Sequence, residues 1–170
     1  MKSLYGFLLL GLVALLCGCA SSAPVCISRG TDSVRNYKYV YVAPTEGYSL
    51  STDIGSVVTT NPATSMAMYT SSTVTQTANP STIIKGWAIK KGYVVVYDIR
   101  PEFAEQTMII TCAETNRRSL GGGIIEMTAQ CVSAKTYQII CVYSAESYGW
   151  GSEPNRVKNA VNKCMSAMFK

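Results

Sequence analysis

An apolar run at the amino terminus constrains this chain more than any other feature. After Lys2, the stretch from Leu4 to Leu16 is nearly all apolar. A helix that spans a bilayer needs about 20 apolar residues, so this run is too short to cross one. A short positive region followed by a short apolar run is typical of a secretory signal peptide, which is removed from the mature protein. We therefore expect an exported chain whose fold begins after this run.

The apolar run ends in a motif that resembles the lipobox of bacterial lipoproteins. The sequence Leu16-Cys17-Gly18-Cys19 places an apolar residue and two small residues before a cysteine. The resemblance implies that signal-peptide residues 1–18 are removed and that Cys19 is acylated as the first mature residue. Acyl chains would hold the protein at a membrane, because each buried CH₂ contributes about 0.8 kcal/mol. The alternative is an ordinary cleaved signal peptide with a cysteine there by chance.

The residue after Cys19 bears on the choice of membrane. In the sorting rule for such lipoproteins, an aspartate at this position retains the protein at the inner membrane, and here the residue is Ala20. No acidic run of the kind linked to surface export follows. The resemblance therefore implies an outer-membrane lipoprotein that faces the periplasm.

The composition excludes several classes of function. Histidine is absent, which removes Ser-His-Asp and Cys-His nucleophiles and histidine metal ligands. The net charge of +5 comes from scattered Lys and Arg residues, whereas a nucleic-acid interface needs a dense basic stripe. Hydrophobic residues make up 48% of the chain, which is enough for a core. We expect a folded, non-enzymatic protein with no cofactor and no nucleic-acid partner.

Five cysteines follow Cys19, so at least one of them is free or pairs between chains. They are Cys26, Cys112, Cys131, Cys141 and Cys164. No Cys-x-x-Cys spacing suggests zinc. An oxidising compartment permits disulfides, but all except Cys26 lie in apolar patterns that also suit small buried residues. The sequence leaves the pairing open.

The mature chain divides into a polar tether over residues 19–36 and a single α/β domain over 37–170. Alternating or continuous apolar runs predict five strands, at 37–43, 93–97, 107–113, 124–132 and 137–145. The strand at 37–43 is expected to be central and the one at 93–97 to be buried, and residues 114–119 are expected to form a basic turn. Apolar residues at helical spacing, with caps, predict helices at 80–91 and 154–169. The order strand, helix, strand over 37–97 predicts a parallel crossover, and the later strands are expected to be antiparallel. The expected fold is α+β, a mixed sheet of about five strands with two main helices packed on one face.

Residues 45–79 are rich in Ser and Thr and carry few charges. This composition predicts a long, loosely packed loop, with a short strand near 56–60 or 73–77 and an O-glycosylated stretch as alternatives. With both helices on one face of the sheet, the other face would carry Tyr37, Tyr39 and Tyr41. We expect the segment to cover part of that apolar face in a way that a partner can displace, and a second copy or another envelope protein is the alternative cover.

The element order and one hairpin motif resemble those of small bacterial envelope lipoproteins of unknown function. The similarity extends loosely to penicillin-binding-protein activators and to the amino-terminal domain of the Tol-B translocation protein. In the closest group the hairpin reads Asp-Ala-Lys-Thr-Gly, and here Ser133 and Tyr137 replace the first and last of these residues. Cys141 stands where that group has a tryptophan. The resemblance covers residues 37–169 and implies an αβ sandwich with no cofactor and no known catalytic residues.

Two patterns could suggest chemistry, and for each a plainer interpretation is favoured. Three glycines, 121–123, follow Arg117 and Arg118 and could form an anion-binding nest, but they lead into a strand rather than a helix. Glu102 and Glu105 could form the carboxylate pair of a hydrolase, but a solvated turn explains their spacing as well. We assign no catalytic, cofactor-binding or metal-binding residue.

Tyr148 and Trp150 are the candidate partner-binding residues, because they lie together in a loop before the last helix. Ordinary packing at the rim of the core is the alternative. Taken together, the sequence predicts a non-enzymatic outer-membrane lipoprotein that acts as an interaction or assembly module. Its expected partners are the membrane, through the lipid anchor, and an envelope protein or a second copy. A surface-exposed glycan-binding or host-binding lipoprotein is the alternative.

Replacing the acylated residue tests the predicted anchor. We expect Cys19→Ser to abolish labelling by radioactive palmitate and to leave the protein unprocessed or soluble, because serine offers no thiol for acylation. Cys17→Ser is the matched control, since it keeps a small residue before Cys19 and should preserve labelling. Membrane partition of Cys19→Ser equal to that of the natural chain would contradict the prediction.

Overall fold

The structure of the protein is a computed structural model that describes residues 22–60, 67–118, 123–149 and 151–170. The predicted signal peptide, Cys19 and Trp150 lie outside the described residues. Within these ranges, no helix combines the length and the apolar content needed to cross a bilayer.

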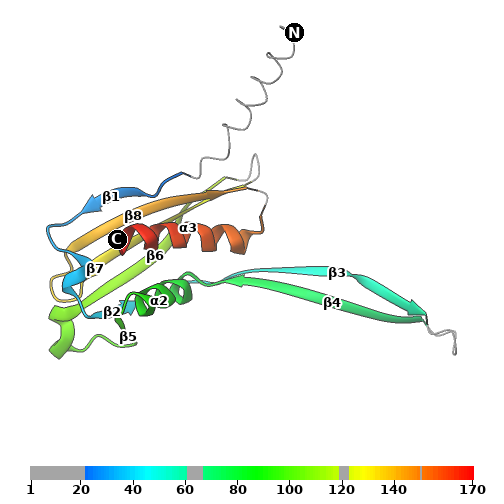
Figure 1. The fold of residues 1–170 in the computed structure, drawn as a ribbon, viewed down its shortest axis with the longest axis horizontal. Coiled ribbons are helices and arrows are strands. Elements are labelled where there is room, and N and C mark those ends of the chain that lie inside the picture. Colours follow the sequence, from blue (N-terminus) through cyan, green and yellow to red (C-terminus); the bar gives the residue numbers. More distant parts are fainter. Residues whose placement is uncertain (1–21, 61–66, 119–122, 150) are drawn as a thin grey trace, which may run out of the picture.

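A mixed six-stranded sheet forms the body of the protein (Figure 1). Its strands, in spatial order, are β1 (Val25–Arg29), β8 (Ile139–Tyr148), β7 (Ile124–Ser133), β6 (Thr107–Arg118), β2 (Tyr39–Val42) and β5 (Val94–Val96). β2 runs parallel to both β5 and β6, whereas β6, β7, β8 and β1 pair antiparallel. The predicted α+β class, the parallel crossover and the central place of β2 are confirmed. The sheet has one strand more than expected.

Two helices, α2 (Pro80–Lys90) and α3 (Glu153–Met168), pack on one face of this sheet, as predicted (Figure 1). α2 lies over β5, β2 and β6, and α3 lies over β7 and β8. The Asn79 side chain begins α2 by accepting a 3.2 Å hydrogen bond from the Thr82 amide. After α2, Gly92 has a φ of +87°, a left-handed conformation that favours glycine and ends the helix. Two short 3-10 helices, η1 (Val34–Asn36) and η2 (Pro101–Gln106), complete the body.

The core lies between the helices and alternate residues of the strands. Every second residue of β7 is buried, as the two-residue period of a strand requires. These are Ile125, Met127, Ala129, Cys131 and Ser133. They face an apolar stripe of α3 made of Val157, Ala160, Val161, Cys164, Met165 and Met168, all buried.

The boundary expected between tether and domain is wrong. Residues 25–29 form β1, which pairs with β8 at the edge of the sheet. Tyr37 does not share a face with Tyr39 and Tyr41, because it is buried in the core and its hydroxyl donates a 2.5 Å hydrogen bond to Asp32. All five residues of β1 are exposed, so this edge strand lacks the alternation of buried and exposed residues that marks a half-buried strand.

The predicted bounds of two strands also need correction. β6 continues through Glu114 to Arg118, where the sequence suggested a basic turn. A register shift between Glu114 and Asn116 marks an irregularity that lets the polar second half of the strand stay paired with β7. β5 was expected to be buried, but it is an edge strand and Val94 is 46% exposed.

The segment expected to be a long loop forms a two-stranded antiparallel hairpin. Its strands are β3 (Tyr48–Thr60) and β4 (Ala67–Ala78). Figure 1 shows the hairpin extending away from the body. Its contacts with the body are mainly with α3, so it does not cover the helix-free face of the sheet as expected. The segment forms strands rather than a loop because threonine is β-branched and favours strands. A composition rich in Ser and Thr is also compatible with a loop, so the sequence did not distinguish the two.

A charge placed in the α3 stripe tests the core. Cys164 is fully buried, and burial raises the pKa of its thiol to about 12. We expect Cys164→Asp to lower the free energy of unfolding by at least about 3 kcal/mol, because it buries a carboxylate or forces its neutralisation. Ser166→Asp, on the exposed side of the same helix, should change it by less than about 0.5 kcal/mol. Thermal or urea denaturation measures both, and equal effects would contradict the assignment of the stripe.

Candidate functional site

The β3–β4 hairpin and its attachment to the body form the candidate functional site. The pairing runs from Tyr48 opposite Ala78 at the base to Thr60 opposite Ala67 near the tip. Among the described residues, β3 and β4 pair only with each other, so each strand has an outer edge that no other strand covers. A two-stranded hairpin is marginally stable alone in water, so this one depends on its attachment and on any partner.

Hydrogen bonds close the base of the hairpin where the chain enters and leaves it. Thr45 precedes β3, and Asn79 and Ser81 follow β4. The Thr45 and Ser81 hydroxyls donate to Asn79 Oδ1 at 3.2 and 2.7 Å. The Ser81 amide donates in turn to Thr45 Oγ1 at 2.9 Å. The start of α2 therefore holds both ends of the hairpin together.

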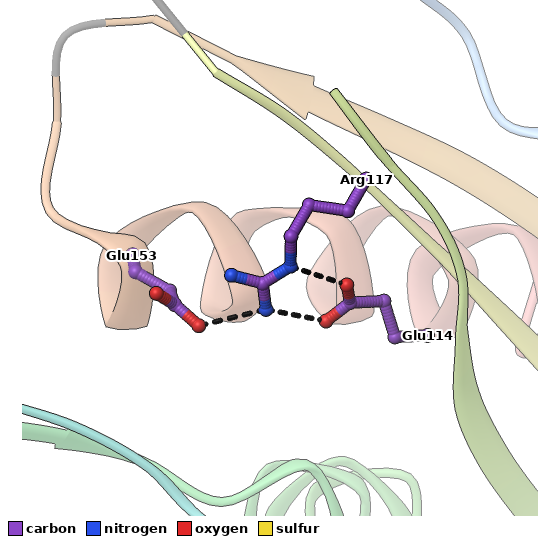
Figure 2. A network of polar contacts seen from close by, with 3 residues as sticks. All are labelled: Glu114, Arg117 and Glu153. Atoms are coloured by element: carbon purple, nitrogen blue, oxygen red, sulfur yellow. Dashed lines mark hydrogen bonds and ion pairs between the residues drawn. The ribbon is translucent and has the colours of Figure 1, made fainter. Parts of the chain in front are cut away.

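An ion-pair network links the base of the hairpin to the sheet and to α3 (Figure 2). Arg117 donates two hydrogen bonds to the Glu114 carboxylate, from Nε at 2.6 Å and from Nη2 at 2.8 Å. Arg117 Nη2 also lies 2.8 Å from Oε1 of Glu153, at the start of α3. The first residue of β3, Tyr48, lies close enough to this pair for the charges of Glu114 and Arg117 to shift its pKa. Residues from β3, β6 and α3 thus meet around one guanidinium.

The network shifts the pKa values of its members. Burial, reinforced by the charge and the hydrogen bond of Glu114, raises the pKa of Tyr48 to about 12. The Arg117 hydrogen bond lowers the pKa of Glu114 below its usual value, and the Glu114 and Glu153 carboxylates raise the pKa of Arg117. The arrangement therefore keeps the ion pairs charged at neutral pH and leaves the tyrosine protonated, which suits a structural role rather than proton transfer. We call the ion-pair network of Glu114, Arg117 and Glu153 the clamp.

One further contact joins β4 to α3. The Ser152 hydroxyl lies 2.6 Å from Oε1 of Gln76 instead of capping the amides of α3. Sequence reasoning missed this whole attachment, because its residues lie far apart in the chain and Glu114 and Arg117 seemed to belong to a turn. The cluster of charges at 114–118 was the one signal available.

The candidate partner-binding residue Tyr148 lies at the end of β8 and is 41% exposed. Lys163 Nζ lies 5.8 Å from the centre of its ring, in a cation–π contact. Tyr148 and Trp87 both line an open groove of about 600 Å³ along α3. Trp150 lies outside the described residues.

The other patterns of the sequence do not form a chemical site. The Arg117 side chain is engaged by two carboxylates rather than open to an anion. Gly123 has a φ of +72°, and the Arg156 guanidinium approaches it so closely that a Cβ atom would lie 3.1 Å away. Glu105 in η2 pairs with Lys135 on the surface. In the described part of the chain, no group of three or more Cys, Asp or Glu residues could hold a metal ion.

Comparisons with known proteins support the fold and little else. No known protein-family profile matches the sequence, and no curated protein is similar to it. Among solved structures, the chain is similar to a leucine-to-methionine variant of the PelC dodecamer from Paraburkholderia phytofirmans, with a TM-score of 0.50 and 12% identity. That match covers 86% of this chain and 98% of the other. A second PelC dodecamer structure has a TM-score of 0.46 and 10% identity over the same shares. Neither is a penicillin-binding-protein activator or a Tol-B domain, so that resemblance stays a prediction.

Neutralising the clamp should loosen the hairpin. We expect Glu114→Gln to speed amide hydrogen exchange at both ends of the hairpin base, near Tyr48 and Ala78, and to cost about 1 kcal/mol, because a half-exposed ion pair contributes little more. Glu105→Gln is the matched control, since it removes a carboxylate paired with Lys135 far from the hairpin. Equal exchange in the two variants would show that Glu114 does not hold the base.

The same clamp should depend on pH. Because the folded-state pKa of Glu114 lies below its ordinary value of 4.5, its stabilisation is fully present above pH 4.5. It should disappear as the pH falls through the lowered pKa. Hydrogen exchange at the hairpin base, corrected for the intrinsic pH effect, should show this loss in the natural chain and not in Glu114→Gln. If hydrogen exchange at the hairpin base changes with pH in the same way in the natural chain and in Glu114→Gln, this prediction is wrong.

Proposed function

We propose that this chain is a non-enzymatic lipoprotein of the bacterial outer membrane that faces the periplasm and works by assembling with copies of itself. One observation carries the proposal, the β3–β4 hairpin that extends from the body (Figure 1). The lipobox-like motif ending at Cys19 supports the anchor, and the absence of histidine supports a role without catalysis.

The composition of the hairpin supports assembly. Proteins usually protect exposed strand edges with lysine, proline or inward-facing charges, because a free edge pairs readily with another strand. Between residues 48 and 78 the sequence holds one charged residue, Asp53, and one proline, Pro62. An edge with so little protection suits a segment that another chain covers by strand addition.

The choice of a second copy as the partner draws on the structural comparison. The similar PelC structures are described as dodecamers. At 12% identity that likeness reaches only as far as the fold, so it makes self-association the first form of assembly to test. An envelope protein seated on the same hairpin is the other outcome.

Shortening the hairpin tests the proposal. Replacing the segment from Ile54 to Ser72 by Asn-Gly leaves Asp53 opposite Thr73 and closes the strands with a two-residue turn. We expect the natural full-length chain, extracted from membranes in mild detergent, to sediment as a discrete oligomer. The shortened chain should sediment as a monomer with the same thermal stability of the body, because β1, β2 and β5–β8 are untouched.

Each other outcome contradicts a stated part of the proposal. A natural chain that is monomeric across its soluble concentration range excludes self-association. A different envelope protein that co-sediments with the natural chain and not with the shortened one replaces the second copy as partner. Natural chain recovered in the soluble fraction excludes the lipid anchor. Monomeric chain that binds glycans would favour the glycan-binding alternative.

A further inference from the structure

Two cysteines face each other across neighbouring strands of the body. Cys131 in β7 lies directly opposite Cys141 in β8, in an antiparallel pair. We infer that these two residues form one disulfide when the exported chain meets a disulfide oxidant, and that Cys141 is the residue that attacks the oxidant first. The oxidising compartment rests on the proposed function, whereas the pairing rests on the structure alone.

The register supplies the geometry that a disulfide needs. Residues directly opposite each other in an antiparallel pair have Cα atoms about 4.5 or 5.5 Å apart, depending on the hydrogen-bonding site. Both separations fall within the roughly 4.4–6.8 Å that disulfides span. Opposite residues also point to the same face of the sheet, so the two Cβ atoms approach each other. No change in strand pairing is required.

Both side chains belong to the same buried layer. Cys131 and Cys141 are buried on the helix-covered face of the sheet, and their opposite register places them side by side. Cys131 Sγ also lies 3.4 Å from Met108 Sδ. The two cysteine sulfurs are not bonded to each other in this structure.

The remaining cysteines have no comparable geometry. Cys26 lies opposite Tyr143, two residues along β8 from Cys141, and Cys112 lies opposite Ala129, two residues along β7 from Cys131. Diagonal neighbours of this kind are about 7–8 Å apart, beyond the usual reach of a disulfide. The third, Cys164, directs its sulfur to the carbonyl oxygen of Met127 at 3.3 Å.

The surroundings distinguish the two thiols. Cys141 lines a cavity of about 330 Å³ that also borders Arg29, Arg35 and Asp32, whereas Cys131 is fully buried and does not line it. The hydrogen bond from Cys131 and the charge of Arg29 lower the pKa of Cys141, while the same hydrogen bond and burial raise the pKa of Cys131. A thiolate is the attacking form, so an oxidant that enters this cavity meets the reactive sulfur first.

The reaction balances with the oxidant alone. The Cys141 thiolate attacks one sulfur of the oxidant disulfide, whose S–S bond breaks as a mixed disulfide forms and the second sulfur leaves as a thiolate. That thiolate takes the proton of Cys131. Cys131 then attacks the Cys141 sulfur, forms the intramolecular bond and releases the remaining oxidant sulfur as a thiolate. Two electrons pass from the two cysteines to the oxidant.

Peptide mapping of the full-length chain tests the pairing. The protein is extracted from membranes in detergent, reduced, freed of reductant and treated with oxidised glutathione. Free thiols are blocked with one maleimide, disulfides are reduced, and the released thiols receive a heavier maleimide. We expect the heavy label on Cys131 and Cys141 in most molecules and the light label on Cys26, Cys112 and Cys164. Cys141→Ser should remove the heavy label from Cys131, and Cys112→Ser should leave it.

Trapping thiols in intact cells before extraction completes the experiment. Light label on both Cys131 and Cys141 after glutathione treatment of the purified chain overturns the pairing, whatever compartment the protein occupies. Heavy label on a different pair also overturns it. If the pair forms in the purified chain but is reduced in cells and the protein fractionates with the cytosol, the pairing stands and the proposed envelope function falls. Oxidised pairs in the membrane fraction support both.

Discussion

The packing of α3 against β7 and β8 is the contact on which the rest of the structure depends. The α3 stripe and the inward residues of β7 contribute most of the fully buried side chains of the body. Because burial of apolar surface is the main stabilising contribution to folding, this layer fixes which faces of β7 and β8 point inward. It also places the start of α3 beside β6, where Glu153 meets Arg117. The attachment of the hairpin is therefore a consequence of how the core packs.

The sequence predicted the elements whose residues repeat with a clear period. α2 has an N-cap, both helices have apolar stripes, and β7 alternates along its whole length, so their positions followed from the residues alone. β1 was missed because an exposed edge strand has no buried face to imprint a pattern. The hairpin was missed because β-branched polar residues are compatible with both strand and loop, and the two-stranded pairing of β3 with β4 adds no alternation of apolar residues.

The candidate site was less accessible to sequence reasoning than the fold. Tyr48, Glu114, Arg117 and Glu153 are separated by up to about a hundred positions in the sequence, and only the tertiary packing brings them together. The cysteines differ in this respect. Their apolar surroundings correctly indicated that Cys131, Cys141 and Cys164 are buried, but the register of β7 on β8 was needed to single out one pair. Burial and pairing are compatible here, because a cysteine behaves as a small apolar residue until an oxidant reaches it.

The clamp at the base and the free edges of the hairpin act on different parts of it. The hydrogen bonds of Thr45 and Gln76 hold the start of β3 and the end of β4, whereas the distal pairs up to Thr60 and Ala67 have no other strand beside them among the described residues. Two strands alone bury too little surface to be firmly stable, so the distal half gains most from any chain that pairs with it. A partner that binds only the ordered hairpin stabilises that order by mass action. In the assembly that we propose, the order of the distal hairpin and the extent of assembly are therefore thermodynamically linked.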